Sequence, residues 1–218
     1  MAIPPIAPYS MPGADAFTAA QVDWTAEPGR CALLIHDMQQ YFLDAYDLNQ
    51  DPAMTLVANI TRLRARCHDL GIPVIYTMQP GNQHPSRRGI LADFWGSGMA
   101  EGADTEVIAA LAPQPQDIQV TKWRYSAFQR TDLRELLGYY RRDQLLVTGV
   151  YTHMGCMLSA AEAFMGDVRP FLVHDATADF SRDEHVMALN YVARRCGAVT
   201  GTDALLRRLD AARVEADA

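Results

Sequence analysis

Two neighbouring residues in one turn of this chain decide which chemistry it can perform. The turn 149–157 follows an apolar segment and precedes a helical pattern, and it contains Gly155 and Cys156 side by side. A thiol in such a strand-to-helix turn is a candidate nucleophile, and Asp37 and Lys122, which follow two other apolar segments, are its candidate partners. Covalent chemistry is therefore available only if Cys156, rather than Gly155, faces Asp37 and Lys122.

Several common site signatures are missing from the sequence. There is no GxxxxGK[ST] phosphate loop, no GxSxG serine motif and no HExxH metal motif, and the segment 96–102 misses the GxGxxG spacing of dinucleotide sites. An acidic cluster is expected to form a turn and the first turn of a helix with Ser181 as its N-cap, rather than a metal site. Its members are Asp175, Asp179, Asp183 and Glu184. We therefore expect no metal and no cofactor.

The elements that position the candidate residues alternate along the chain. Short apolar runs predict strands, and periodic apolar residues with Gly or Pro near their ends predict helices. A long Gly-rich loop is expected at 78–102. The predicted strands are 31–36, 73–77, 118–121, 145–150, 170–174 and 198–200, and the predicted helices are 52–70, 105–111, 133–140, 155–165, 183–195 and 202–213.

This alternation predicts an α/β fold. Continuously apolar strands separated by helices indicate a mainly parallel sheet covered on both faces, a three-layer αβα sandwich of about six strands. We expect residues 1–29, rich in Pro, Gly and Ala, to form an N-terminal arm packed on a single domain that spans 30–218.

Asp37 and Lys122 also have simpler interpretations. An Asp after a strand often caps the following turn, and a lone loop lysine is often exposed. However, both residues follow predicted strands, and open α/β sheets bind ligands at the carboxyl ends of their strands. Their shared position at one edge of the sheet favours a functional site.

Composition and charge narrow the function further. The 218 residues carry a net charge of −7, which disfavours nucleic-acid binding because that depends on clustered Lys and Arg. No apolar run approaches the roughly 20 residues of a membrane span, and the N-terminus does not resemble a secretory signal. The 4 cysteines are dispersed without CxxC spacing, which predicts reduced thiols in a cytoplasmic protein.

Several unbroken motifs resemble those of isochorismatases. The similarity runs from about residue 5 to residue 205, so the chain is identified as a member of the isochorismatase-like, or cysteine hydrolase, superfamily, which also contains nicotinamidases. The matching motifs are 35–42 (IHDMQQYF), 79–81 (QPG), 93–96 (DFWG), 122–128 (KWRYSAF), 149–156 (GVYTHMGC) and 175–185 (DATADFSRDEH).

The resemblance assigns roles to the candidate residues. Amidases of the superfamily use an Asp–Lys–Cys triad, whose first two members match Asp37 and Lys122. Their cysteine is the sixth residue after the first glycine of the turn, and this position is Gly155 here. Cys156 comes one residue later, a rotation of about 100° on a helix, so we expect a packed, inert thiol. The implied catalytic positions are Asp37, Lys122 and Gly155.

The resemblance also implies a set of substrate contacts. Gln79 and Arg88 match the family's contacts to substrate carboxylates, and Arg87 is a weaker match. Backbone N–H groups of Tyr151 and of the glycine at the nucleophile position are suited to bind a carboxylate or oxyanion. The family's non-proline cis peptide corresponds to Val150–Tyr151. The remaining predicted substrate-binding residues are Phe42, Trp95 and Tyr125.

A site with an acid and a cation but no nucleophile suits the isochorismatase reaction. The resemblance implies hydrolysis of the enolpyruvyl vinyl ether of isochorismate to 2,3-dihydro-2,3-dihydroxybenzoate and pyruvate, with Asp37 as general acid. The alternative is the same reaction on 2-amino-2-deoxyisochorismate, giving 2,3-dihydro-3-hydroxyanthranilate in a phenazine-type pathway. An amidase that uses Cys156 is less favoured. A non-catalytic scaffold is disfavoured by the joint presence of the acid, the cation and the predicted carboxylate contacts.

The same resemblance implies the partners of the chain. The substrate is a small dicarboxylate, and members of the family form homodimers or higher homo-oligomers. Some siderophore isochorismatases carry a C-terminal aryl carrier domain, but no serine-bearing carrier motif follows the last predicted helix here. We therefore expect any carrier protein or synthetase to be a separate partner.

Overall fold

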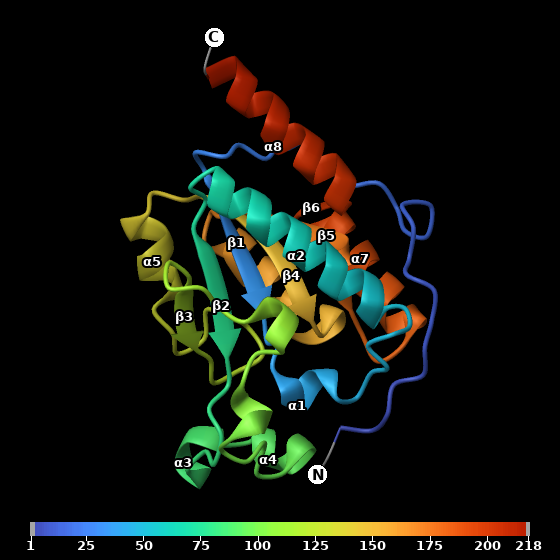
Figure 1. The fold of residues 1–218 in the computed structure, drawn as a ribbon, viewed down its shortest axis with the longest axis vertical. Coiled ribbons are helices and arrows are strands. Elements are labelled where there is room, and N and C mark those ends of the chain that lie inside the picture. The colour runs from blue at the N-terminus through green and yellow to red at the C-terminus, as the bar shows by residue number, and fades with distance from the viewer. Residues whose placement is uncertain (1–2, 217–218) are drawn as a thin grey trace.

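The computed structural model describes residues 3–216. A six-stranded, fully parallel sheet forms its centre, with the strand order β3-β2-β1-β4-β5-β6 (Figure 1). The predicted α/β fold class is therefore confirmed. The strands are β1 (Cys31–His36), β2 (Val74–Met78), β3 (Ile118–Thr121), β4 (Gln144–Val150), β5 (Arg169–Ala178) and β6 (Ala198–Thr200).

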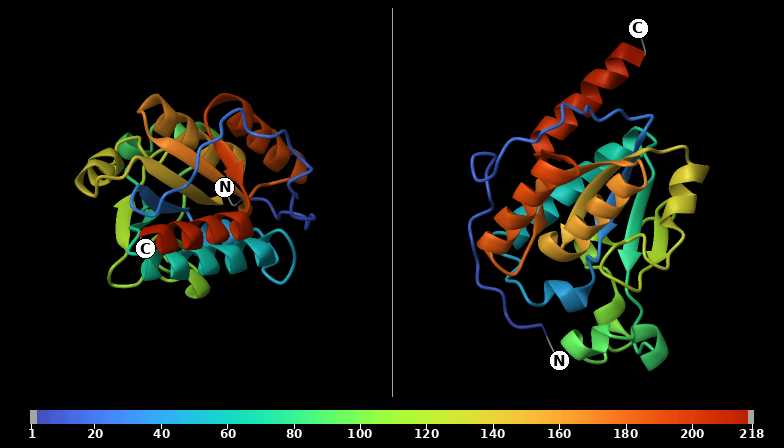
Figure 2. Two further views of the ribbon diagram at one scale, coloured as in Figure 1. Left: turned by 90° about the horizontal axis from the view of Figure 1, so that it is seen from above. Right: turned by 180° about the vertical axis from the view of Figure 1, so that it is seen from behind.

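Helices cover both faces of the sheet (Figure 2). On one face lie α2 (Ala53–Asp69) and α8 (Thr202–Ala216), and on the other lie α5 (Leu133–Tyr139), α6 (Met157–Met165) and α7 (Arg182–Arg195). The side chains of β1 alternate between two hydrophobic cores, because successive residues of a strand point to opposite faces. Leu33 and Ile35 join the core under α2, and Ala32 and Leu34 join the core under α6.

The N-terminal arm runs over the surface without regular secondary structure from residue 3 to residue 29. It is fixed to α7 by hydrogen bonds from Gln21 N to Ala193 O (3.0 Å) and from Thr18 N to Asn190 Oδ1 (3.0 Å). Ile6 is buried in the core of the sheet domain. Residues 1, 2, 217 and 218 of the predicted arm and domain lie outside the described residues.

The predicted helix at 105–111 is wrong. The segment forms two short 3-10 turns, η1 (Ala103–Thr105) and η2 (Ala109–Leu111), with an extended stretch between them. Val107 in that stretch forms an antiparallel bridge with Gln39, and Ile108 N donates to Met38 O at 3.0 Å. Backbone N–H and C=O groups of this segment therefore bond to the segment after β1 instead of to each other within a helix.

Other differences concern where elements begin and end. The 78–102 segment contains two short helices, α3 (Pro85–Arg88) and α4 (Leu91–Trp95), where the sequence predicted only a loop. The helix predicted from residue 155 begins earlier as a π-helical turn, η3 (Thr152–Cys156), and continues as α6. The predicted strand 170–174 continues to residue 178, past an irregularity in its pairing with β4.

Within residues 3–216, the helices are too short or too polar for any of them to cross a membrane.

Ser181 caps α7 as the sequence predicted, and this gives a stability test. The Ser181 hydroxyl accepts a hydrogen bond from Glu184 N (3.2 Å), as an N-cap does, and donates to the Glu184 carboxylate (2.7 Å). We expect Ser181→Ala to lower the free energy of unfolding by about 1 kcal/mol in urea titrations. Ser10→Ala, at an exposed position of the arm, is the control; equal stability of the two variants would contradict the capping role.

Candidate active site

Asp37 lies at the carboxyl end of the central strand β1, and the fold buries it. Its side chain does not cap a helix, since α1 (Gln40–Leu43) begins three residues later with Gln39 at its N-cap. The backbone of Asp37 has a φ of +50°, a left-handed conformation that Asp tolerates better than most residues. Oδ1 accepts a hydrogen bond from Thr77 Oγ1 and Oδ2 from Gln79 Nε2, each at 2.9 Å. Asp37 is thus held from β2 and the loop after it.

Lys122 follows β3 and completes a buried ion pair. Its Nζ lies 2.9 Å from Asp37 Oδ2, and the lysine is only 1% exposed, so the exposed-loop interpretation is wrong. Lys122 Nζ also donates to Arg124 O (2.6 Å). Burial by itself raises the pKa of the Asp37 carboxyl, but His36, Lys122 and the hydrogen bonds from Gln79 and Lys122 together hold this pKa below its usual value.

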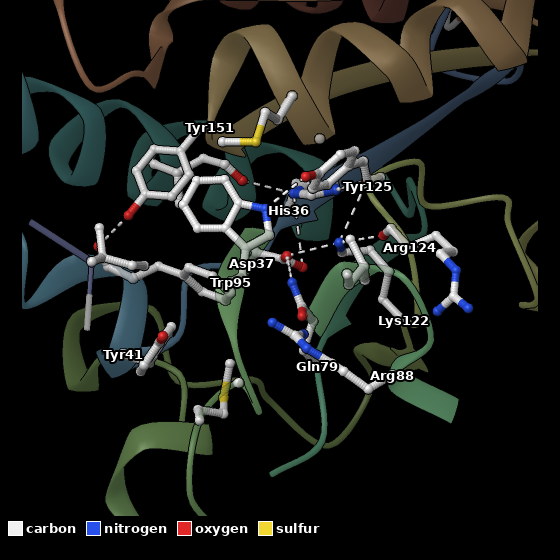
Figure 3. Close-up of a pocket in the computed structure, with 18 of the residues that line it drawn as sticks. His36, Asp37, Tyr41, Gln79, Arg88, Trp95, Lys122, Arg124, Tyr125 and Tyr151 are labelled. Carbon is white, nitrogen blue, oxygen red and sulfur yellow. Dashed lines mark hydrogen bonds and ion pairs between the residues drawn. The ribbon is translucent and has the colours of Figure 1, made fainter. Parts of the chain in front are cut away.

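The predicted site residues converge on one cavity of about 620 Å³, a volume that includes its part open to solvent. The carboxylate, the ammonium ion and the predicted carboxylate contacts point toward its centre (Figure 3). All nine residues that the sequence analysis selected line this cavity: Asp37, Phe42, Gln79, Arg88, Trp95, Lys122, Tyr125, Tyr151 and Gly155.

The two arginines of α3 take opposite positions. Arg88 is 6% exposed and lines the cavity, with its Nε donating to Gly96 O at 3.1 Å. Arg87 is exposed, and its guanidinium stacks over the Trp123 ring at 5.5 Å from the centroid. The short helix that the sequence did not predict is therefore what directs Arg88, and not Arg87, to the cavity.

Aromatic side chains form much of the cavity wall. Trp95 Nε1 donates to Tyr125 Oη at 2.6 Å, and the Trp95 ring stacks on Phe180 with centroids 6.2 Å apart. Tyr151 Oη donates to Phe42 O at 3.0 Å. The walls therefore offer apolar surface for a planar ring, and the Val150–Tyr151 peptide at the back of the cavity is cis.

Gly155 and Cys156 point to different parts of the molecule. Gly155 lines the cavity, whereas Cys156 is fully buried in the core between the sheet and α6, with its Sγ 3.8 Å from Thr148 O. Burial raises the pKa of the Cys156 thiol well above its usual value. A thiol that stays protonated inside an apolar core is a poor nucleophile.

Ten further residues that were not predicted as site residues line the cavity, and three of them carry rings. His36, Tyr41 and Phe180 all line the cavity. His36 immediately precedes Asp37 and is 1% exposed. The sequence showed that His36 is the last residue of a strand, and strand alternation places its side chain on the face opposite Ile35. Alternation cannot show that the ring lies beside the turn after β4.

The predicted acidic cluster is distributed over separate structural roles. Asp175 accepts hydrogen bonds from Thr202 N and Oγ1, both at 2.8 Å, and so caps α8. Asp179 is fully buried and pairs with the ring of His153 at 2.6 Å. In the part of the chain that the structure describes, no three His, Cys, Asp or Glu side chains come together as a metal site would require.

Known proteins are similar to this chain in both sequence and fold. The isochorismatase domain model matches residues 31–204. An isochorismatase of Bacillus subtilis is 50% identical over 96% of this chain and 67% of its own length. The phenazine biosynthesis protein PhzD of Pseudomonas fluorescens is 48% identical over 92% of this chain and 97% of its own length.

A solved structure extends the likeness to the fold. The cysteine hydrolase from Pseudomonas syringae pv. phaseolicola has a TM-score of 0.80 and 27% identity, over 88% of this chain and 97% of that one. The match of the family model and the identity to these relatives identify this chain as a hydrolase that belongs to the isochorismatase family.

Proposed function

We propose that this chain hydrolyses the enolpyruvyl vinyl ether of isochorismate to 2,3-dihydro-2,3-dihydroxybenzoate and pyruvate, as a step of siderophore or other secondary-metabolite synthesis. The observation that carries the proposal is the pairing of a buried acid and cation with a glycine at the position of a nucleophile. Asp37 and Lys122 lie 2.9 Å apart beside Gly155, while the nearest thiol is enclosed in the core.

In this mechanism Asp37 is the general acid. Its carboxyl proton is transferred to the terminal methylene carbon of the enolpyruvyl group, whose double-bond electrons form the new C–H bond. Water attacks the resulting oxocarbenium carbon and returns a proton to the Asp37 carboxylate. The hemiketal hydroxyl then loses its proton as its oxygen forms the ketone of pyruvate, the bond to the ring oxygen breaks, and the ring oxygen takes up a proton to give the diol. No bond to the enzyme forms at any stage.

The proton on Asp37 requires the substrate. In the free enzyme the pKa of Asp37 is held below its usual value, so the carboxyl is ionised at neutral pH. A bound dicarboxylate adds negative charge to the cavity, and like charge raises the pKa of a carboxyl group. Substrate binding thus favours the protonated form of Asp37, which is the form that the reaction needs. Lys122 then stabilises the Asp37 carboxylate that remains after proton transfer.

The same geometry accommodates 2-amino-2-deoxyisochorismate, which has the same vinyl ether and differs at one ring carbon. This substrate is the second candidate because the chain matches nearly the whole length of a phenazine biosynthesis protein. The kcat/KM values for the two substrates, measured side by side by pyruvate release, decide between them.

The remaining parts of the proposal concern assembly and location. We propose a homodimer or higher homo-oligomer in the cytoplasm, with a carrier protein or synthetase as its partner. The support is the family membership together with the reduced, buried state of all four cysteines, Cys31, Cys67, Cys156 and Cys196.

Asp37→Asn tests the general acid. The amide keeps the size of the side chain but has no acidic proton to give, and general acids contribute roughly 10²- to 10⁴-fold. We expect kcat for pyruvate release, followed with lactate dehydrogenase and NADH, to fall by this factor. An unchanged circular dichroism spectrum controls for folding. Turnover close to that of the unmodified enzyme would refute the role.

Cys156→Ala separates vinyl-ether hydrolysis from thiol chemistry. The variant loses one buried sulfur atom, so we expect about 1 kcal/mol less stability and an unchanged kcat for pyruvate release from the folded protein. Ammonia release from nicotinamide, measured in parallel, should be absent in both proteins. Complete loss of turnover in a folded Cys156→Ala protein would favour the amidase instead.

Arg88→Ala tests the carboxylate contact, with Arg87→Ala as its matched control. A hydrogen-bonded charge pair is worth roughly 1.5–3 kcal/mol, so KM should rise roughly 10- to 100-fold in Arg88→Ala. Arg87 is exposed and stacks on Trp123 outside the cavity, so its variant should keep its KM. Equal effects of the two substitutions would contradict the assignment of Arg88.

A further inference from the structure

The ring of His36 stands where a side chain at residue 155 would lie. A Cβ atom built on Gly155 would come within 2.0 Å of His36 Cε1 and 2.5 Å of Nε2. Real Cβ atoms do not approach other atoms so closely, and His36 is 1% exposed. The chain therefore holds either this ring or a side chain at residue 155, but not both.

The ring is fixed by contacts on both sides. Its Nδ1 and Nε2 lie 2.8 and 3.2 Å from the carbonyl oxygens of Val150 and Tyr125. A carbonyl oxygen only accepts hydrogen bonds, so the shorter contact places a proton on Nδ1, which donates to Val150 O. Tyr125 O accepts a hydrogen bond from Lys122 Nζ at 3.4 Å. The ring thus donates to the turn after β4 and packs against the loop that carries Lys122.

The backbone of His36 is also unable to retreat from Gly155. His36 pairs with Gly149 across β1 and β4. Gly149 has a φ of +106°, and a Cβ there would lie 2.1 Å from His36 O. Two glycines on the β4 side, Gly149 and Gly155, therefore make room for the backbone and the ring of one residue, and a close approach of this kind is a specific use of glycine.

We propose that His36 is a positioning residue that fills the place of a nucleophile and holds the turn after β4 and the Lys122 loop around Asp37. The inference rests on the proposed function, because it explains why a site with this acid and cation acts without a covalent intermediate. His36 lies 3.8 Å from Asp37 Oδ1, so movement of the ring would move the acid and its neighbours together.

The charge state of the ring agrees with this role. Burial, together with the Lys122 ammonium ion, lowers the pKa of His36 despite the nearby Asp37 carboxylate. The ring is therefore neutral at pH 7 and serves as a hydrogen-bond donor rather than as a second cation beside Lys122.

A double-mutant cycle tests the steric part of the proposal. Gly155→Ala should lower Tm by roughly 2–12 °C, the range expected for overpacking a core in a chain of this size. His36→Ala removes Cε1, Nε2 and Nδ1, the three ring atoms that lie within 2.7 Å of the new methyl group. In the His36→Ala background the Gly155→Ala substitution should therefore lower Tm much less than it does alone. Additive losses of Tm would overturn the proposal.

Gly138→Ala is the matched control for added volume at a helical glycine. Nothing lies within 4 Å of a Cβ at this position in α5, so the substitution should leave Tm unchanged or slightly raised. A Tm loss as large as that of Gly155→Ala would show that any such substitution is harmful, and would overturn the specific role of the ring.

The positioning role is read from kcat and KM for pyruvate release. His36→Asn keeps a donor for Val150 O, whereas His36→Leu fills space without one, so His36→Asn should retain at least tenfold more kcat, a factor that one hydrogen bond can supply, at similar KM. Equal kcat values would overturn this role. If the unmodified protein released no pyruvate from either substrate, the proposed function would fail, while the Tm cycle would still decide whether the ring excludes a side chain at residue 155.

Discussion

The buried pair of Asp37 and Lys122 is the interaction on which the site depends. Both side chains are almost fully buried, at 3% and 1% exposure, and their charged atoms lie 2.9 Å apart. Burying either charge alone costs several kcal/mol, and the attraction between the two opposite charges offsets this desolvation cost. The remaining side-chain hydrogen bonds of the pair join it to Thr77, Gln79 and the carbonyl groups of Arg124 and Tyr125. This polar cluster holds the pKa of the Asp37 carboxyl below its usual value in the protein without substrate.

The sheet is what brings these residues together. β1 lies at its centre between β2 and β4, and β3 is next to β2. Because all strands are parallel, their carboxyl ends share one edge, and residues at or just after the ends of β1 to β5 line the same cavity. At this edge the backbones of β1 and β4 also approach each other unusually closely, because Gly149 has no side chain to collide with the backbone of His36. The architecture is typical of open α/β sheets, but the contents of this edge are specific to the family.

The reaction type depends on which of two neighbouring residues in the turn after β4 faces the cavity. Gly155 lies against the cavity, and Cys156 lies in the core behind it, although the two are neighbours in the chain. The space freed by the missing side chain is not empty, because the His36 ring occupies it. In this chain, Gly155 in the turn after β4 and the His36 ring at the end of β1 therefore form one structural unit.

The sequence by itself determined the sheet, its long helices and the place of Asp37 and Lys122, because strand and helix periodicity are local and the carboxyl ends of parallel strands are known meeting points. The other predicted residues of the cavity came from the resemblance to the isochorismatase family. Only the tertiary structure decided the form of 103–111, where Val107 pairs with Gln39, and the helix that directs Arg88 inward. It also placed His36 against Gly155, residues more than a hundred positions apart in the chain. Such contacts depend on backbone separation across the sheet, which no local pattern encodes.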